Sequence, residues 1–518
     1  MDYLSPEQQK RRVVPNWRFF SETKALGELE SVRKEKGKFS LFAIDDYVDA
    51  WLNRKSFSTA GDLISAAITN GQRQNRYAVE AAKYVEEESP EDYPVLVKSA
   101  DYILNENTDD ILKTPNQQDE SIKRLENAQN MSDRIHDIRK QLMVYPYNAV
   151  LYADMSRAQL SIGKVDKAIK LMQIALQLDP DNRFVVRAAV RLYHHLGDFD
   201  RANAALRHTS LIKYDPWLIA ADVTTGMLRG RNSVHIKTGI NMIESKNYHP
   251  FSCTELASSL GTLEYYFGTR KKSRVFFNSS MVSPNDNSLA QAEWVATKIN
   301  FHLERTQDVK LDYEARFYQS LSDGDLDNSV KELVSWIIDM PYSQKPIYLG
   351  SHLSLSYLGN FELAESILKV GLRVNSENQD FINNMAYALA RQGKTKEAQV
   401  YMDKLMSIDS AEMTESMKVC REATQGLIAY RNGNKEKGQR HYDKAIALAS
   451  EIKDDSPEVY YKAVINAKRE ALIASNYEDT NILEELDRLD VPDSIPELNT
   501  LRQEVVDLFK SHHPLVVN

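Results

Sequence analysis

Cysteine is scarce in this chain, and the motifs of familiar catalytic and metal sites are missing. The 518 residues include two cysteines, Cys253 and Cys420, which excludes a disulfide framework and a cysteine-rich zinc site. No glycine-rich phosphate loop, no Gly-x-Ser-x-Gly elbow and no His-Glu-x-x-His sequence occurs. We therefore expect no enzyme, no catalytic residue, no metal and no cofactor, and leave open only a cryptic activity within residues 1–145.

Long apolar runs and a strong excess of one charge are also missing. No apolar stretch approaches the roughly 20 residues that span a bilayer, and Met1–Glu7 lacks the basic-then-apolar pattern of a secretory signal. The net charge of −9 argues against wholesale coating of nucleic acid. These absences predict a soluble, cytoplasmic protein without a membrane span.

A repeat of about 34 residues is present instead, and repeats of this length are typical of solenoids. Gly163 and Gly197 are turn residues 34 positions apart, and the same pattern recurs at later turns. The further turn residues are Ser233, Gly268, Gly324, Gly359, Gly393 and Gly433. A small residue stands five positions after each turn and a large one nine positions after it, as in Ala168 and Met172. Small residues let two helices approach closely, and glycine suits the tight turn between them.

The Gly-x-Phe turns at 197–199 and 359–361, with the unit-closing prolines Pro180, Pro250 and Pro341, resemble the tetratricopeptide repeat (TPR) family over about residues 147–450. The resemblance implies an all-α fold. It implies an α-α solenoid, a right-handed superhelix of helix-turn-helix repeats, with a helical N-terminal region and C-terminal capping helices. A generic helical bundle is the alternative.

The pattern also divides the chain into regions. Between Gly268 and Gly324 the spacing exceeds one repeat, which indicates an inserted helix. The expected regions are a basic and aromatic segment (1–58), a helical pre-repeat region (59–145) with a polar loop near 105–120, TPR-like repeats (146–286), the inserted helix (287–306), further TPR-like repeats (307–450) and capping helices (451–518).

In the TPR family the first helix of each repeat lines a concave groove, so the resemblance implies that its solvent-facing positions contact ligands. Arginine and tyrosine, which are enriched at binding hot spots, recur at these positions. The candidate partner-binding residues are Arg157, Arg187, Arg191, His194, Tyr318, Asn383, Tyr387 and Arg391. The alternative is that the arginines are solvated and the tyrosines pack.

The favoured function is a protein–protein interaction scaffold, or a regulatory or adaptor subunit of a multiprotein complex, that binds a partner peptide or helix in the groove. Arg157, Arg187 and Arg191 are expected to converge on one patch suited to an acidic peptide or a chain terminus. The alternative is a nucleic-acid-associated subunit that uses the N-terminal basic-aromatic region and the basic run Arg270, Lys271, Lys272 and Arg274. The sequence leaves the partner, the pathway and the oligomeric state undecided, and it favours a protein partner over nucleic acid.

Overall fold

The computed structural model describes residues 17–20, 51, 55–69, 76–88, 94–105, 121–122, 124–125, 131–245, 247–296, 298–299, 309, 311–478, 481–489, 491–492 and 495–512. Throughout these stretches every regular element is a helix, and neighbouring helices pair as antiparallel hairpins, as in a solenoid. The predicted all-α solenoid is therefore confirmed. Most of the basic and aromatic region 1–58 and of the polar loop near 105–120 lies outside the described residues.

The contacts divide the chain into two compact units. Unit 1 comprises Met1–Gln117 and Asn130–Met340, and unit 2 comprises Gln118–Gln129 and Pro341–Asn518.

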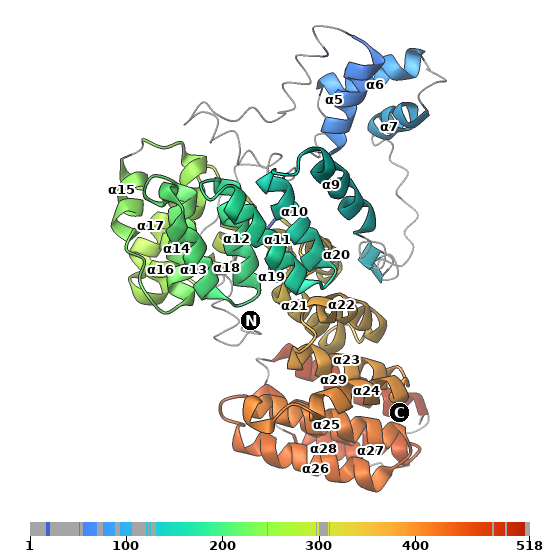
Figure 1. The fold of residues 1–518 in the computed structure, drawn as a ribbon. Coiled ribbons are helices and arrows are strands. Elements are labelled where there is room, and N and C mark those ends of the chain that lie inside the picture. The colour runs from blue at the N-terminus through green and yellow to red at the C-terminus, as the bar shows by residue number, and fades with distance from the viewer. Residues whose placement is uncertain are drawn as a thin grey trace. The chain divides into compact units, whose positions relative to one another are not determined.

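Unit 1 consists of a small helical cluster around the buried Trp51, followed by stacked hairpins (Figure 1). Its described helices are α5 (Phe57–Thr69), α6 (Arg76–Glu88), α7 (Pro94–Asn105), α9 (Ser132–Val144), α10 (Ala149–Ser161), α11 (Val165–Leu178), α12 (Arg183–His195), α13 (Phe199–His208), the 3₁₀ helix η2 (Ser210–Lys213), α14 (Pro216–Leu228), α15 (Ile236–Glu244), α16 (Pro250–Phe267), α17 (Arg270–Ser280), α18 (Asp286–Ala296), α19 (Tyr313–Ser322) and α20 (Leu326–Asp339). The segment expected as an inserted helix (287–306) contains all but the first residue of α18, which packs against α16 and α19.

Unit 2 repeats the hairpin architecture and ends in a long helix, α29 (Figure 1). Its described helices are α21 (Gln344–Ser356), α22 (Phe361–Val374), α23 (Gln379–Arg391), α24 (Thr395–Met406), the 3₁₀ helix η3 (Ser410–Glu412), α25 (Glu415–Arg431), α26 (Lys435–Glu451), α27 (Pro457–Ala474), α28 (Asn481–Asp487) and α29 (Pro496–His512).

The small residues of the repeat lie where the two helices of a hairpin touch. Ala168 and Ala398 are fully buried, and so are the large residues Met172 and Met402 that follow them one helical turn later. The Ser156 hydroxyl donates a hydrogen bond to the Ala168 carbonyl at 2.7 Å, so α10 and α11 are in close contact there. Gly197 has φ 74°, a left-handed conformation that favours glycine. The repeat pattern therefore identified the contacts that hold each hairpin together.

Two turns differ from the expected pattern. Between α14 and α15 the left-handed residue is Gly230, three positions before the predicted Ser233, because this loop is longer. The close helix contact there is made by Gly239, where a Cβ would lie 3.0 Å from Leu256 Cδ1. At Gly268 the backbone is not left-handed, with φ −125°. A Cβ there would displace the Glu264 carboxylate, which accepts a hydrogen bond from the Thr269 amide.

Candidate functional site

Trp17–Phe20, called here the N-terminal segment, lies against the first helices of the unit 1 hairpins. We call the surface formed by α10, α12, α14, α16 and α18 the inner face of unit 1. Trp17, Arg18 and Phe19 are 0%, 2% and 2% exposed, although residues 17–19 carry no regular secondary structure. A short irregular segment is buried so completely only where a surface is shaped to receive it.

Helix α10 holds the main chain of the N-terminal segment. The Arg157 Nε donates a hydrogen bond to the Trp17 carbonyl oxygen at 2.8 Å. The Phe20 amide donates to Asp154 Oδ1 at 2.9 Å. Because these bonds involve backbone atoms, they fix the path of the segment without selecting its side chains.

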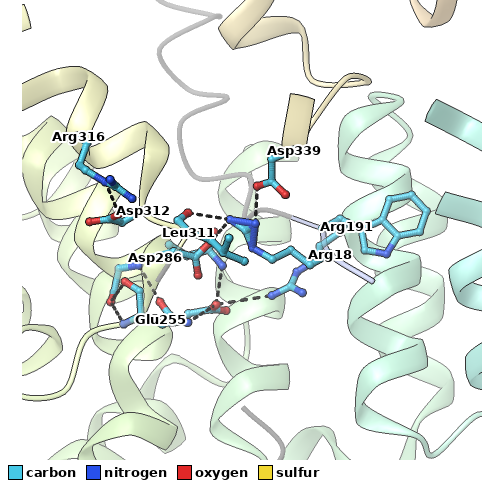
Figure 2. Close-up of polar contacts among 12 residues, drawn as sticks. Arg18, Arg191, Glu255, Asp286, Leu311, Asp312, Arg316 and Asp339 are labelled. Atoms are coloured by element: carbon cyan, nitrogen blue, oxygen red, sulfur yellow. Dashed lines mark hydrogen bonds and ion pairs between the residues drawn. The ribbon is translucent and has the colours of Figure 1, made fainter. Parts of the chain in front are cut away.

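The Arg18 side chain enters a pocket made by three distant parts of unit 1 (Figure 2). Its Nη2 lies 2.6 Å from Asp286 Oδ2, at the start of α18, and donates to the Leu311 carbonyl oxygen at 3.1 Å. Its Nη1 pairs with the carboxylate of Asp339, at the end of α20. The pocket therefore satisfies a planar guanidinium on several sides at once.

The backbone of the Arg18 pocket is strained at one point. Leu311 has φ 57°, a left-handed conformation that is uncommon for any residue other than glycine. Such strain costs about 1–3 kcal/mol, and it persists where the surrounding contacts enforce it. The Leu311 carbonyl is the group that accepts the hydrogen bond from Arg18. Strain of this kind is concentrated at binding sites, which supports a functional role for the pocket.

The aromatic side chains of the segment also have defined partners. The Phe19 ring lies between two guanidinium groups, with the Arg134 and Arg157 Cζ atoms 3.7 and 3.8 Å from its centroid. The Phe20 ring meets Phe184 of α12 edge to face, with centroids 5.0 Å apart. Cation–π and edge-to-face contacts add attraction beyond simple apolar burial. The segment is thus recognised through its side chains as well as its backbone.

The structure brings two of the predicted arginines, Arg187 and Arg191 of α12, to one carboxylate, Glu255 of α16. The distances are 2.6 Å from Arg187 Nη2 and 3.6 Å from Arg191 Nη2 to the Glu255 oxygens. Burial raises the pKa of Glu255, but Arg187, Arg191 and two asparagine hydrogen bonds outweigh it and lower the pKa below its usual value. Burial and the neighbouring Arg191 lower the pKa of Arg187 to about 10, so both partners stay charged at neutral pH.

Arg157 and Arg191 are buried as well, and Arg157 also donates to the Asp339 main-chain carbonyl at 2.8 Å. The predicted arginines therefore pair with carboxylates and carbonyl groups of the chain itself. Figure 2 shows Arg191 on the side of Glu255, and Arg18 between Asp286 and Asp339.

His194 lies in the interior of unit 1. Its Nε2 is 2.9 Å from the Thr225 hydroxyl oxygen, whose proton is donated to the Ala221 carbonyl, so the histidine is the donor in that pair. Burial, with His195 and Arg191, lowers the pKa of His194 to about 3. The imidazole is therefore neutral at pH 7. Tyr318 of α19 is half-buried beside Trp336, with ring centroids 6.5 Å apart.

A small cavity of about 40 Å³ lies between α12, α14, α16 and α18 on the inner face. Its polar lining includes Arg187, Arg191, Glu255, Thr224 and Gln291. A cavity of this volume holds one or a few water molecules and leaves no room for a bulky ligand.

In unit 2 the predicted residues Asn383, Tyr387 and Arg391 all lie on α23. Asn383 Oδ1 accepts a hydrogen bond from the Thr424 hydroxyl at 3.0 Å. Tyr387 accepts one from Arg391 Nη1 at 2.9 Å, and the Arg391 guanidinium lies 4.2 Å from the centroid of the Phe361 ring.

These contacts lead to the C-terminal helix α29, which carries Glu497 and Glu504. Arg391 Nη2 lies 2.5 Å from Glu504 Oε1. Glu497 accepts from the Tyr357 hydroxyl at 2.7 Å and pairs with Lys462 Nζ at 2.9 Å. The first helices of the unit 2 hairpins thus bind a helix of the same chain through its carboxylates.

The basic run predicted as an anion contact lies in the first turn of α17, and its members Arg270, Lys271, Lys272 and Arg274 are all exposed. Lys272 Nζ approaches Glu264 Oε1 at 3.9 Å. Positive charge at a helix N-terminus is unfavourable because the helix dipole is positive there. The run therefore contributes nothing evident to the stability of α17.

Sequence reasoning missed the acidic partners and the N-terminal segment. Glu255 lies 13 residues before Gly268, on the same face of the first helices as the candidate arginines, but the predicted site contains no acidic residue. Trp17–Phe20 belongs to the basic and aromatic region 1–58, and no local pattern connects it with Asp286 or Asp339.

Within the described residues no group of three or more His, Cys, Asp and Glu side chains is placed to hold a metal ion. A search of the same residues finds no helix with the length and apolar character that a membrane crossing requires.

The stacked hairpins define the chain as an α-helical solenoid of the helical-repeat type. No protein-family model matches the chain, and no curated protein matches it. Among solved structures, the crystal structure of yeast Tom70 is similar to this chain, with 13% sequence identity and a TM-score of 0.26. The similarity covers 76% of this chain and 95% of that one.

Proposed function

We propose that the chain is a protein–protein interaction scaffold or adaptor subunit, and that the inner face of unit 1 binds a short segment of a partner protein. The observation that supports this most directly is the N-terminal segment itself. It contacts the inner face as a bound peptide would, through two backbone hydrogen bonds and a set of side-chain contacts.

The predicted partner-binding residues divide between two roles in this proposal. Arg157 contacts the bound segment directly, through the Trp17 carbonyl and the Phe19 ring. Arg187 and Arg191 fix α12 to α16 through Glu255, which keeps the inner face in shape. In unit 2, Arg391 contacts a helix through Glu504, so the later hairpins are suited to a helical partner.

A peptide-display selection tests the proposal. The target is the full chain with residues 17–20 replaced by Gly-Ser-Gly-Ser, compared with the same chain carrying Arg157→Ala. Arg207→Ala is the matched control, because Arg207 is exposed on α13. Removing a hot-spot arginine costs at least about 2 kcal/mol, roughly a thirtyfold loss of affinity. We expect the selected peptides to lose affinity by that factor for the protein that carries Arg157→Ala, and not for the protein that carries Arg207→Ala. Equal affinity for all three folded proteins, or no enriched peptide, would refute the proposal.

The alternative, a nucleic-acid-associated subunit, is supported by the exposed basic turn of α17. Because the chain is net acidic, we expect only weak, salt-sensitive binding. Nanomolar affinity for DNA or RNA at physiological salt, lost in the double variant Lys271→Glu, Lys272→Glu, would favour the alternative over the scaffold.

A further inference from the structure

We propose that the N-terminal segment is a resident ligand that closes the unit 1 site, and that the partner segment replacing it carries an arginine flanked by aromatic residues. This inference rests on the proposed function, since it names the chemistry and the control of the same site. The occupant of the open site is thus a partner peptide with side chains like those of Trp17–Phe20.

The requirement for arginine comes from the Arg18 pocket. Asp286 and Asp339 approach from different helices, α18 and α20, and the Leu311 carbonyl approaches from a third position. A planar guanidinium presents several N–H groups at fixed angles and can reach all three acceptors, whereas a lysine ammonium is a single point of charge. An acidic side chain would be repelled by both carboxylates.

The same pocket explains why the resident segment is replaced by another ligand and does not simply dissociate to leave an empty site. Asp286 is 2% exposed, and removing one partner of a buried ion pair is strongly unfavourable. The arginine of an incoming segment therefore replaces Arg18 at the carboxylates, and departure of Arg18 alone is costly. The pocket therefore selects partner segments that carry an arginine.

The aromatic preference comes from the positions on either side of Arg18. The residue after the arginine lies between the guanidinium groups of Arg134 and Arg157, and the next one lies against the Phe184 ring. The residue before it is Trp17, which is fully buried. Aromatic side chains fill all three positions in the resident segment, and a partner with the same side chains makes the same contacts.

Covalent attachment gives the resident segment its advantage. A segment linked to its own site acts at an effective concentration in the millimolar range, so a free peptide of equal intrinsic affinity competes poorly. The segment contributes no strand and, in residues 17–19, no helix. Its exchange for a similar segment therefore leaves the hairpins of unit 1 in place.

The experiment uses the full chain and a fluorescein-labelled synthetic peptide with the sequence of residues 12–23, followed by fluorescence anisotropy. Wild type, Arg18→Glu and the exposed control Arg207→Glu are compared, and folding is verified by thermal melting. We expect the peptide to bind Arg18→Glu at least tenfold more tightly than wild type or the control. A second peptide, in which lysine replaces the arginine equivalent to Arg18, should bind the Arg18→Glu protein at least tenfold more weakly than the arginine peptide does. If Arg18→Glu does not fold, Phe20→Ala, which loses only one half-buried ring, should show a smaller gain.

Four results would overturn the inference. Equal peptide affinity of wild type and folded Arg18→Glu would mean that the segment does not close the site. Equal affinity of the arginine and lysine peptides would mean that the pocket does not select a guanidinium. A wild-type dimer that dissociates in Arg18→Glu would mean that the segment is exchanged between two copies. If this peptide binds no variant while the display selection yields Arg157-dependent peptides, the inference fails and the proposed function stands. If the display selection yields no Arg157-dependent peptide, the proposed function itself fails.

Discussion

The two units bind segments of their own chain with opposite charge patterns. In unit 1 the hairpins supply the carboxylates of Asp286 and Asp339, and the bound segment supplies Arg18. In unit 2 the hairpins supply Arg391 and Lys462, and the bound helix α29 supplies glutamates. The same hairpin architecture therefore presents surfaces that select opposite charges, because a few side chains make the choice.

The ion pairs of Glu255 in unit 1 and Glu504 in unit 2 differ in how deeply they are buried, whereas Glu497, on the same helix as Glu504, is 3% exposed. The Arg187, Arg191 and Glu255 side chains of unit 1 are nearly inaccessible, whereas Glu504 of unit 2 is 39% exposed. Breaking a buried ion pair leaves an uncompensated charge in the interior, and water compensates an exposed one. Removing Glu255 should therefore have a larger effect than removing Arg391, whose partner Glu504 is 39% exposed.

The largest effect is expected from Glu255→Ala, which leaves Arg187 and Arg191 buried without their carboxylate. Removing one partner of a buried ion pair costs about 3–5 kcal/mol. Thermal melting combined with hydrogen exchange should show faster exchange in α12 and α16, while exchange in unit 2 is unchanged. Glu244→Ala, at an exposed end of α15, is the control. A melting temperature for Glu255→Ala equal to that of the control would contradict the assigned ion pairs.

A second effect on stability, intermediate in size, is expected when the pH is lowered. The pKa of His194 is about 3 in the folded chain and about 6.5 when unfolded. The unfolded chain therefore binds more protons below pH 6.5, so this stability is complete above that pH and is lost as the pH falls toward 3. At pH 5 the expected loss is on the order of 2 kcal/mol.

The substitution His194→Gln should reduce the loss between pH 7 and pH 5 in unit 1, as measured by hydrogen exchange. It should leave the acid response of unit 2 unchanged, where burial lowers the pKa of His352 to about 4. Some response should remain in unit 1, because burial and Arg191 also lower the pKa of His195 to about 3. An acid response of unit 1 that is identical with and without His194 would show that this histidine does not contribute.

The smallest effect is expected from Arg391→Ala in unit 2. The variant loses the contact with Glu504 and the stacking on Phe361, but water reaches Glu504. We expect a cost of about 1 kcal/mol, seen as faster hydrogen exchange in α29 with little change in overall melting. Arg488→Ala, whose ion pair with Glu484 is highly exposed, should have no measurable effect. A change in α29 as large as that caused by Glu255→Ala in unit 1 would contradict the difference between the two surfaces.

The fold was predictable because its signal is local. The turn residue, the small residue and the large residue of each hairpin lie within ten positions of one another, so one chain segment displays all three. The prediction failed at Ser233, because a longer loop shifts the left-handed turn to Gly230.

The binding partners of the arginines were not predictable in the same way. Arg187 and Glu255 are 68 positions apart, and Arg18 and Asp339 are 321 apart. Contacts at such separations depend on the curvature of the stacked hairpins, which no repeat pattern specifies.

The separation between Arg18 and Asp339 also has a consequence for how the chain is made. The ribosome synthesises the N-terminal segment long before α18 and α20, which supply its two carboxylates. At about 5–20 residues per second, the interval of 321 residues lasts on the order of tens of seconds. During that interval the aromatic residues of the segment have no completed site, so they are open to chaperones or to another protein already present. The contacts of Arg18 with Asp286 and Asp339 can therefore form only after translation has passed α20.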